Sequence, residues 1–235
     1  MRTILISGAS RGIGRSIALK ALEDGHRLSL GIRDPNDLKG SKLDPNISGK
    51  DRILLSHYEA NEKQYAKEWV SATINHFGHF DSLINCAGIF KRTSFLFSKE
   101  EELEIDQLWK INVMAPWWLT KEAWNEISSN GQGRVIFLVS MSGKRSKGSL
   151  AGYSMSKFAL MGLCQTIRNE GWEKGVRVTA ICPSWVNTNR AADIKSINRS
   201  QMTQPEDIAS ISSNLLSLPN SCIPFELAIN CNLET

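Results

Sequence analysis

The sequence predicts an α/β fold: a doubly wound parallel sheet of about seven strands with helices on both faces, in a single domain over residues 1–235. Short apolar segments alternate with longer segments of helical spacing along the whole chain. A glycine-rich turn joins the first of these strands to the first helix. A length of 235 residues suits one large domain, because a split would leave each half small.

The expected strands are apolar and are bounded by glycine, proline or polar residues. They are Thr3–Ser7, Arg27–Ile32, Ile53–Ser56, Asp81–Asn85, Arg134–Ser140, Val176–Cys182 and Phe225–Asn230. Helical spacing predicts helices at Ile13–Leu22, Tyr65–Phe77, Glu101–Ser128, Tyr153–Glu173 and Pro205–Leu218. Pro116 is expected to kink or interrupt the third of these. The polar stretch Arg33–Lys50 is predicted to be a loop with room for one short helical turn.

Composition and charge are those of an ordinary globular protein, with 41% hydrophobic residues, 22% charged residues and a net charge of +4. The basic residues are scattered, so neither nucleic acid nor a membrane is expected as a partner. Five widely spaced cysteines without a Cys-x-x-Cys pair, and four dispersed histidines, predict reduced thiols and no metal site. The apolar run at the amino terminus is too short for a signal peptide, so a cytoplasmic location is expected.

The turn after the first strand has the spacing Gly-x-x-x-Gly-x-Gly, at Gly8, Gly12 and Gly14. Between a strand and a helix, such a turn lets backbone amides and the helix N-terminus meet a pyrophosphate. Taken alone it is weak evidence, because tight glycine loops also occur in α/β proteins of other function. Its position in the chain makes it a candidate dinucleotide-binding turn.

Tyr153 and Lys157 stand four residues apart within a predicted helix. This offset places both side chains on one helix face, where an ammonium group favours the ionised form of a phenol. A free phenol has a pKa near 10, so acid/base work at neutral pH requires strong local positive charge. The two residues are a candidate acid/base pair, although isolated helical tyrosines and lysines usually lie on the surface.

Several motifs follow one another in a fixed order. They are Gly8-x-x-x-Gly12-x-Gly14, Asn85-Cys86-Ala87-Gly88, Asn112, Ser140, Tyr153-x-x-x-Lys157 and Pro183-Ser-Trp-Val-Asn-Thr188. In this order they resemble the short-chain dehydrogenase/reductase family over most of the chain. Cys86 departs from the family's second asparagine, and Ser184 stands where glycine is usual. The resemblance implies a Rossmann-type fold and hydride transfer between a nicotinamide cofactor and a carbonyl or alcohol substrate.

The resemblance also implies roles for single residues. Tyr153 would act as general acid/base, Lys157 would hold the nicotinamide ribose and lower the tyrosine pKa, and Ser140, with Ser142 as the alternative, would orient the substrate oxygen. Asn112 would hold a water that leads to solvent. Such parts suit the chemistry, because hydride arriving at a carbonyl carbon leaves negative charge on oxygen. The implied cofactor contacts are Gly8, Ser10, Arg11, Gly12, Ile13, Gly14, Arg33, Asn85, Ala87, Gly88, Tyr153, Lys157, Pro183, Val186 and Thr188.

The end of the second strand decides between the two nicotinamide cofactors, because an acid there bonds the ribose diol of NAD and a base meets the extra phosphate of NADP. Here Ile32 occupies the place of the acid and Arg33 follows it, with Arg11 as a second cation in the glycine turn. Two arginines favour NADP, and NAD is the alternative. Asp34, an acid next to Arg33, argues against NADP. The alternative interpretation of Arg33 is a solvated cation in a loop, with no role in cofactor binding.

Substrate and assembly are less determined by the sequence. A short polar loop at about 188–204 is expected to cover the substrate, and Trp185, Phe90 and Leu150 are candidates for an apolar wall. The resemblance implies a homodimer or homotetramer. The long helix also carries three tryptophans, Trp117, Trp118 and Trp124. They are expected to pack either against a partner subunit or within one subunit. Two alternative functions are a dinucleotide-binding sensor or scaffold without turnover, and a nucleotide-sugar epimerase or dehydratase, a class whose members are longer chains.

Overall fold

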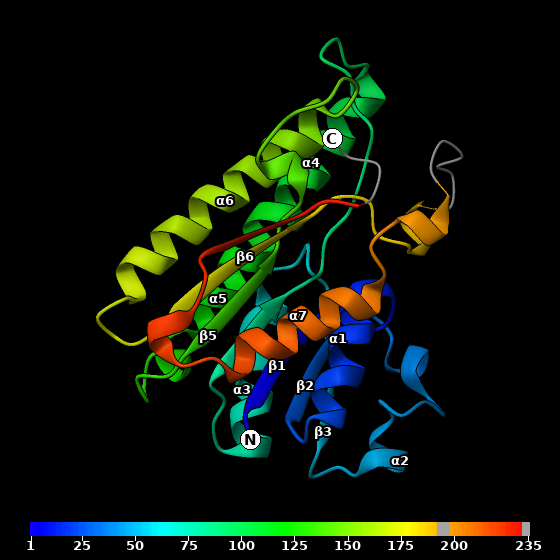
Figure 1. The fold of residues 1–235 in the computed structure, drawn as a ribbon. Coiled ribbons are helices and arrows are strands. Elements are labelled where there is room, and N and C mark those ends of the chain that lie inside the picture. The colour runs from blue at the N-terminus through cyan, green and yellow to red at the C-terminus, as the bar shows by residue number, and fades with distance from the viewer. Residues whose placement is uncertain (192–197, 232–235) are drawn as a thin grey trace.

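One parallel sheet organises the molecule, which we describe from a computed structural model covering residues 1–191 and 198–231 (Figure 1). The strands are β1 Thr3–Ser7, β2 Arg27–Ile32, β3 Ile53–His57, β4 Ser82–Asn85, β5 Arg134–Leu138, β6 Arg177–Pro183 and β7 Glu226–Ile229. They form a seven-stranded sheet in the order β3-β2-β1-β4-β5-β6-β7, and every neighbouring pair is parallel. The predicted fold class, a Rossmann-type doubly wound sheet, is therefore confirmed.

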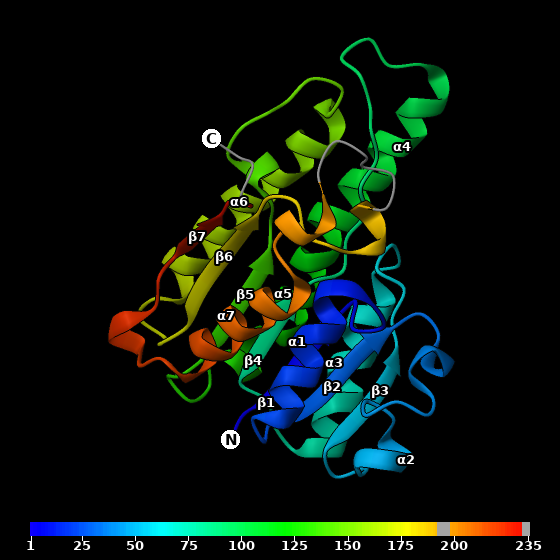
Figure 2. The same cartoon turned by 45° about the vertical axis from the view of Figure 1, so that its right-hand side comes forward.

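Helices cover both faces of the sheet. They are α1 Gly12–Glu23, α2 Pro45–Ser48, α3 Gln64–Phe77, α4 Lys99–Trp109, α5 Ala115–Ile127, α6 Ala151–Gly171 and α7 Pro205–Ser217. The strand order reverses between β1 and β4, and in such sheets the carboxyl ends of the strands at the reversal border the ligand crevice. Figure 2 shows α4 and the segment before it projecting beyond the rest of the ribbon.

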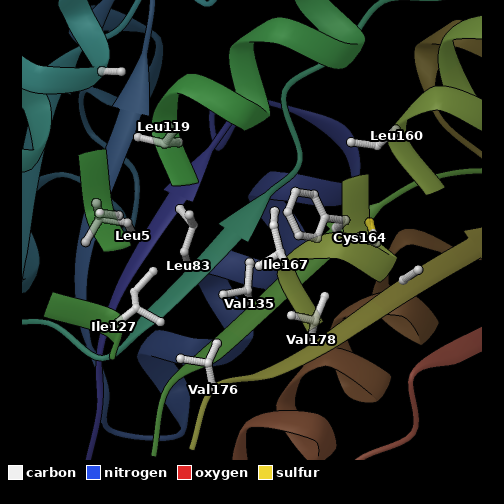
Figure 3. Close-up of a cluster of buried hydrophobic side chains, with 14 of the residues drawn as sticks. Leu5, Leu83, Leu119, Ile127, Val135, Leu160, Cys164, Ile167, Val176 and Val178 are labelled. Carbon is white, nitrogen blue, oxygen red and sulfur yellow. The ribbon is translucent and has the colours of Figure 1, made fainter. Parts of the chain in front are cut away.

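Side chains of alternate strand residues build two separate cores, one on each face. Ile4 and Ile6 of β1 face α1 and α7, whereas Leu5 between them faces α3, α5 and α6. Figure 3 shows this second core. Its strand residues Leu5, Leu83, Val135 and Val178 pack against Leu119, Ile127, Leu160, Cys164 and Ile167 from the helices. The two cores hold the strand ends, and hence the loops that follow them, in fixed positions.

Two sequence predictions need correction. The predicted helix Glu101–Ser128 is divided into α4 and α5 by a π-helical turn at Lys110–Met114. The break thus precedes Pro116, which lies in the first turn of α5, where the missing N–H of proline costs no hydrogen bond. The stretch Arg33–Lys50 contains two short helical segments rather than one, Pro35–Leu38 and α2, each capped by an aspartate side chain.

The tryptophans of α5 divide between core and surface. Trp118 and Trp124 pack against the core on the α3, α5 and α6 face, so for these two the packing within one subunit holds. Trp117 is 51% exposed. A homodimer or homotetramer stays a prediction. In the part of the chain that the structure describes, no helix combines the length and the apolar character needed to cross a membrane.

Candidate active site

The glycine turn after β1 packs against the loop after β4. Gly8 and Gly12 have φ of +72° and +56°, in the left-handed region that glycine adopts without strain. A Cβ on Gly8 would lie 2.9 Å from the Cα of Ala87, and a Cβ on Gly14 would overlap the Gly8 carbonyl. These positions therefore need glycine for close backbone packing.

The N-terminus of α1 points its backbone amides toward this turn and suits an anion. Within the described residues, no side chain caps this helix end, and its first turn carries no acidic residue. Unsatisfied N–H groups and the helix dipole favour a negative group at such an end. Glycines that leave room, an uncapped helix end and the pocket beside them fit the pyrophosphate of a dinucleotide. Ser10 and Arg11 lie in the turn itself, and Ile13 lines the pocket.

Helix α6 carries Tyr153 in its first turn and Lys157 one turn later. The Lys157 ammonium is buried and donates a hydrogen bond of 2.9 Å to the carbonyl of Leu138, the last residue of β5. It lies 5.9 Å from the centre of the Tyr153 ring. A buried cation raises the local positive potential, which favours phenolate over phenol. The spacing of the two residues thus produces the arrangement expected from one helix face.

Ser140 follows β5 and lies across the same pocket. Its Oγ accepts the backbone N–H of Ser142 at 3.0 Å and caps a single 3₁₀ turn, Met141–Gly143. Ser140, Ser142, Tyr153 and Lys157 all line one pocket. Because its oxygen is held by the Ser142 amide, the Ser140 hydroxyl keeps its own proton for a bound oxygen atom.

Asn112 lies in the π-helical turn and is almost fully buried. Its amide makes two bonds with the backbone of Ile89, accepting from N–H at 2.8 Å and donating to the carbonyl at 3.0 Å, and it donates to Ser156 Oγ at 3.1 Å. The side chain thus clamps the loop after β4 to helix α6. A π-turn inserted in a helix is a common way of placing such a residue at a functional site.

Three of the remaining sequence candidates for cofactor contact lie at the ends of β4 and β6. The Asn85 side-chain amide donates to Thr120 Oγ1 at 3.1 Å, a bond that joins the end of β4 to α5. Gly88 and Pro183 line the pocket. Ser7 was not among the candidates from the sequence, and its Oγ accepts the backbone N–H groups of Cys86 and Ala87, both at 3.1 Å. This hydroxyl joins the ends of β1 and β4.

The loop after β6 closes the pocket on its other side. Val186 and Thr188 line it, and Thr188 lies against Gly12 of the glycine turn. The predicted apolar wall is also present, since Phe90, Leu150 and Trp185 all line the pocket. The ring of Phe90 contacts that of Tyr153 edge-on at 4.8 Å between centres. Of the expected substrate loop 188–204, the part 192–197 lies outside the described residues.

The two candidate phosphate cations are accessible. Arg11 and Arg33 are both exposed, and neither forms an ion pair with another residue in the described ranges. Tyr58, the first residue after β3, is 4% exposed and packs on Trp69. Burial raises its pKa far above the usual range. Tyr58 is therefore part of the core.

Helix α6 begins with a cap from a distant segment, which sequence reasoning missed. Its own N-cap residue, Leu150, supplies no side-chain hydrogen bond. Instead, fully buried Thr93 accepts the N–H of Ala151 at its carbonyl, at 3.0 Å, and the N–H of Gly152 at its Oγ1, at 2.9 Å. A Cβ on Gly152 would lie 2.8 Å from that oxygen, so glycine gives Thr93 access. Thr93 thereby positions the turn that carries Tyr153.

Thr93→Val, which removes the hydroxyl and keeps the shape, is expected to lower the free energy of unfolding by about 1–2 kcal/mol, because a buried helix N–H loses its acceptor. Chemical denaturation measures this. Thr166→Val is the matched control, since Thr166 Oγ1 bonds only within its exposed helix turn. An equal loss in both variants would show that the cap contributes nothing special.

Fold and site together define a dinucleotide-binding α/β protein with a Tyr-x-x-x-Lys helix at its ligand crevice. A family model described as short chain dehydrogenase matches residues 2–198. The chain belongs to the short-chain dehydrogenase/reductase family, whose members are oxidoreductases that use nicotinamide cofactors.

Individual relatives agree with this assignment. Agropine synthesis reductase of Rhizobium rhizogenes is 35% identical over 235 residues, which are 99% of this chain and 53% of the relative, so the chain spans about half of that protein's length. Oxidoreductase UcpA of Salmonella typhimurium is 30% identical over 96% of this chain and 84% of its own. An alcohol dehydrogenase from Thermococcus sibiricus, solved with 5-hydroxy-NADP, shares the fold with a TM-score of 0.89 and 24% identity, covering 100% of this chain and 98% of that one.

Proposed function

We propose that this chain is an NADP-dependent dehydrogenase or reductase that interconverts a carbonyl group and an alcohol on a small or medium-sized organic molecule. The observation that carries the proposal is the convergence of Ser140, Tyr153 and Lys157 on one pocket that the glycine-turn helix also borders through Ile13. The names of two relatives, agropine synthesis reductase and acetoacetyl-CoA reductase of Allochromatium vinosum, support reduction as the reaction class.

In this proposal the bound nicotinamide supplies or accepts the hydride, and the protein handles the proton. Tyr153 donates its phenolic proton to the substrate oxygen during reduction and takes it back during oxidation. Ser140 donates a second hydrogen bond to that oxygen and fixes its position. The Lys157 ammonium, held by the Leu138 carbonyl, favours the phenolate that remains after proton transfer.

Each cofactor region has an assigned set of residues. Gly8, Ser10, Gly12 and Gly14 and the N-terminus of α1 would hold the pyrophosphate. Lys157, with Asn85, Ala87 and Gly88 at the end of β4, would hold the nicotinamide ribose side. Pro183, Val186 and Thr188 would hold the nicotinamide. Asn112 is assigned the water that leads to solvent, beside its bonds to Ile89.

The test is a panel of carbonyl compounds and alcohols followed by the absorbance of NADPH, together with NADP and NAD affinities by calorimetry. Turnover of at least one carbonyl compound is expected. Tight cofactor binding without any turnover would favour the alternative, a non-catalytic dinucleotide-binding sensor or scaffold.

Arg33→Ser is expected to raise the Kd for NADPH by about 10- to 100-fold and to leave that for NADH unchanged, because only NADP carries the phosphate that a guanidinium would bond. Calorimetry with both cofactors measures the difference. Arg11→Ser should act in the same direction, and Lys67→Ser, which removes an exposed cation on α3, serves as the control. If the unchanged protein uses NAD as well as it uses NADP, the assignment of NADP as the cofactor is wrong.

A further inference from the structure

Phe90 and Tyr153 meet in the pocket from segments that are far apart in the chain. Their rings are edge-on, with 4.8 Å between the centres and an angle of 75° between the planes. Aromatic pairs prefer this arrangement, because the positive edge of one ring approaches the negative face of the other. Both side chains are half-buried and line the pocket. Phe90 therefore contacts the ring of the proposed acid directly.

The segment that carries Phe90 is held on both sides. The residue before it, Ile89, is bound at both of its backbone groups by the Asn112 side chain, at 2.8 and 3.0 Å. Three residues after Phe90, the Thr93 hydroxyl accepts the N–H of Gly152 at 2.9 Å and so joins the segment to the start of α6. The ring of Phe90 thus projects from a fixed stretch of backbone.

A cation also lies near the Phe90 ring. The central carbon of the Arg92 guanidinium is 5.7 Å from the ring centre, which is within the range of cation–π attraction. Arg92 itself is exposed. Its position over the ring gives Phe90 a further side-chain contact, which restrains the ring in addition to the fixed backbone.

Backbone contacts alone do not orient the phenol. The Thr93 cap fixes the first turn of α6, and with it the Cα of Tyr153, but the side-chain torsions of the tyrosine depend on the groups around the ring. Phe90 is one of these groups, and the Lys157 ammonium, 5.9 Å from the ring centre, is another. Proton transfer requires the acid to lie within hydrogen-bond reach of the substrate oxygen, and a misplacement of about 1 Å costs on the order of 10²-fold in rate. A contact that fixes the ring therefore contributes to the rate of the chemical step.

We propose that Phe90 is a positioning residue, whose ring holds the Tyr153 phenol in the orientation that directs its hydroxyl to the substrate oxygen. The inference rests on the proposed function, in which Tyr153 transfers the proton, and adds to it a residue that acts through the acid. This role differs from that of an apolar wall, in which Phe90 contacts only the substrate. A wall residue affects substrate binding, whereas a positioning residue affects the chemical step.

Kinetics of two variants distinguish the two roles. Phe90→Leu removes the ring and keeps an apolar side chain, and it is expected to lower kcat and the single-turnover rate about tenfold for every substrate while KM stays within about twofold. Phe90→Tyr keeps the ring and should retain kcat within about twofold. Phe95→Leu is the matched control, because Phe95 lies in the same segment and is 86% exposed. An effect of Phe90→Leu on KM alone, largest for bulky substrates, would show only a wall and overturn the inference.

A double-mutant cycle with Tyr153→Phe shows whether Phe90 acts through the phenol. With the hydroxyl absent, there is no proton donor left to orient. Adding Phe90→Leu to Tyr153→Phe should therefore change the residual kcat by less than about twofold, so the two losses are not additive. A further loss of about tenfold in the double variant would contradict the proposed role.

Fluorine NMR tests the position of the ring without turnover. The chain has three tyrosines, Tyr58, Tyr65 and Tyr153, so labelling with fluorotyrosine gives few resonances, and Tyr153→Phe identifies the one of interest. We expect a narrow Tyr153 resonance in the unchanged protein and a broadened or split one in Phe90→Leu, because a released ring exchanges between orientations. Loss of the neighbouring ring current alone would only displace the resonance.

This measurement separates the inference from the proposed function. A resonance that broadens or splits in Phe90→Leu supports the positioning role even if the protein turns over no compound of the panel, a result that would refute only the proposed reaction. An unaltered line shape in Phe90→Leu overturns the inference, whatever happens to kcat. If Phe90→Leu fails to fold, Phe90→Met, which also replaces the ring by an apolar chain, takes its place in each measurement.

Discussion

Tyr153→Phe is expected to lower kcat about a thousandfold, within the 10²- to 10⁴-fold range of general acid catalysis, because in the proposed mechanism the phenolic proton is the one delivered to the substrate oxygen. The fold should be unaffected. Phe90 contacts the Tyr153 ring edge-on at 4.8 Å, a packing that phenylalanine retains. The measurement is steady-state turnover with the best substrate of the panel, beside NADPH affinity and thermal unfolding.

The matched control for this variant is Tyr65→Phe, which also removes one phenolic hydroxyl. Tyr65 lies on α3, and its ring contacts that of His57 on β3 edge-on. It should leave kcat unchanged. Turnover that survives undiminished in Tyr153→Phe would refute the assignment of the acid, whatever the control shows. A loss of NADPH binding with the loss of turnover would instead indicate that the hydroxyl holds the cofactor.

Lys157→Met is expected to have the second-largest effect, a loss in kcat/KM of about a thousandfold together with a cofactor Kd raised about tenfold. The first loss follows because the phenolate loses its neighbouring positive charge, and the second because the proposed ribose contact disappears. Stability should also fall by about 1–3 kcal/mol, since the Leu138 carbonyl loses the donor at 2.9 Å. Stopped-flow turnover, cofactor titration and denaturation measure the three effects separately.

A purely structural lysine would give a different pattern. In that case Lys157→Met would lower the free energy of unfolding, and kcat at a temperature where the variant is folded would remain near that of the unchanged protein. Lys157→Arg, which keeps the charge, should retain more activity than Lys157→Met if the charge acts on the phenol. Lys174→Met controls for the removal of a lysine elsewhere.

Local patterns in the sequence were sufficient for the fold and for the centre of the candidate site. Apolar runs of strand length and helical spacing are read over short windows, so the seven strands and the main helices follow from them within a few residues. The glycine spacing at Gly8–Gly14 and the offset between Tyr153 and Lys157 are likewise local. One helix turn brings the last two to the same face wherever the helix packs.

Contacts between distant segments were beyond such patterns. Thr93 caps α6 across a separation of 59 residues, and Asn112 holds Ile89 and Ser156 through a π-turn that the helical spacing concealed. The sequence also did not indicate that Arg145 and Lys147 line the same pocket as Tyr153. Tyr58, which follows β3, belongs to the core because the packing of α3 brings Trp69 against it.

The alternation of strands and helices, the glycine-rich turn and the tyrosine–lysine pair could all be predicted from the sequence, because each depends on residues close together in the chain. Only the folded chain shows which residues support that pair and which side chains line the pocket beside it. Those features arise where β4, β5, β6 and their loops meet at one edge of the sheet. The residues involved are far apart in the chain, so their contacts form only when the two cores pack and no short sequence pattern predicts them.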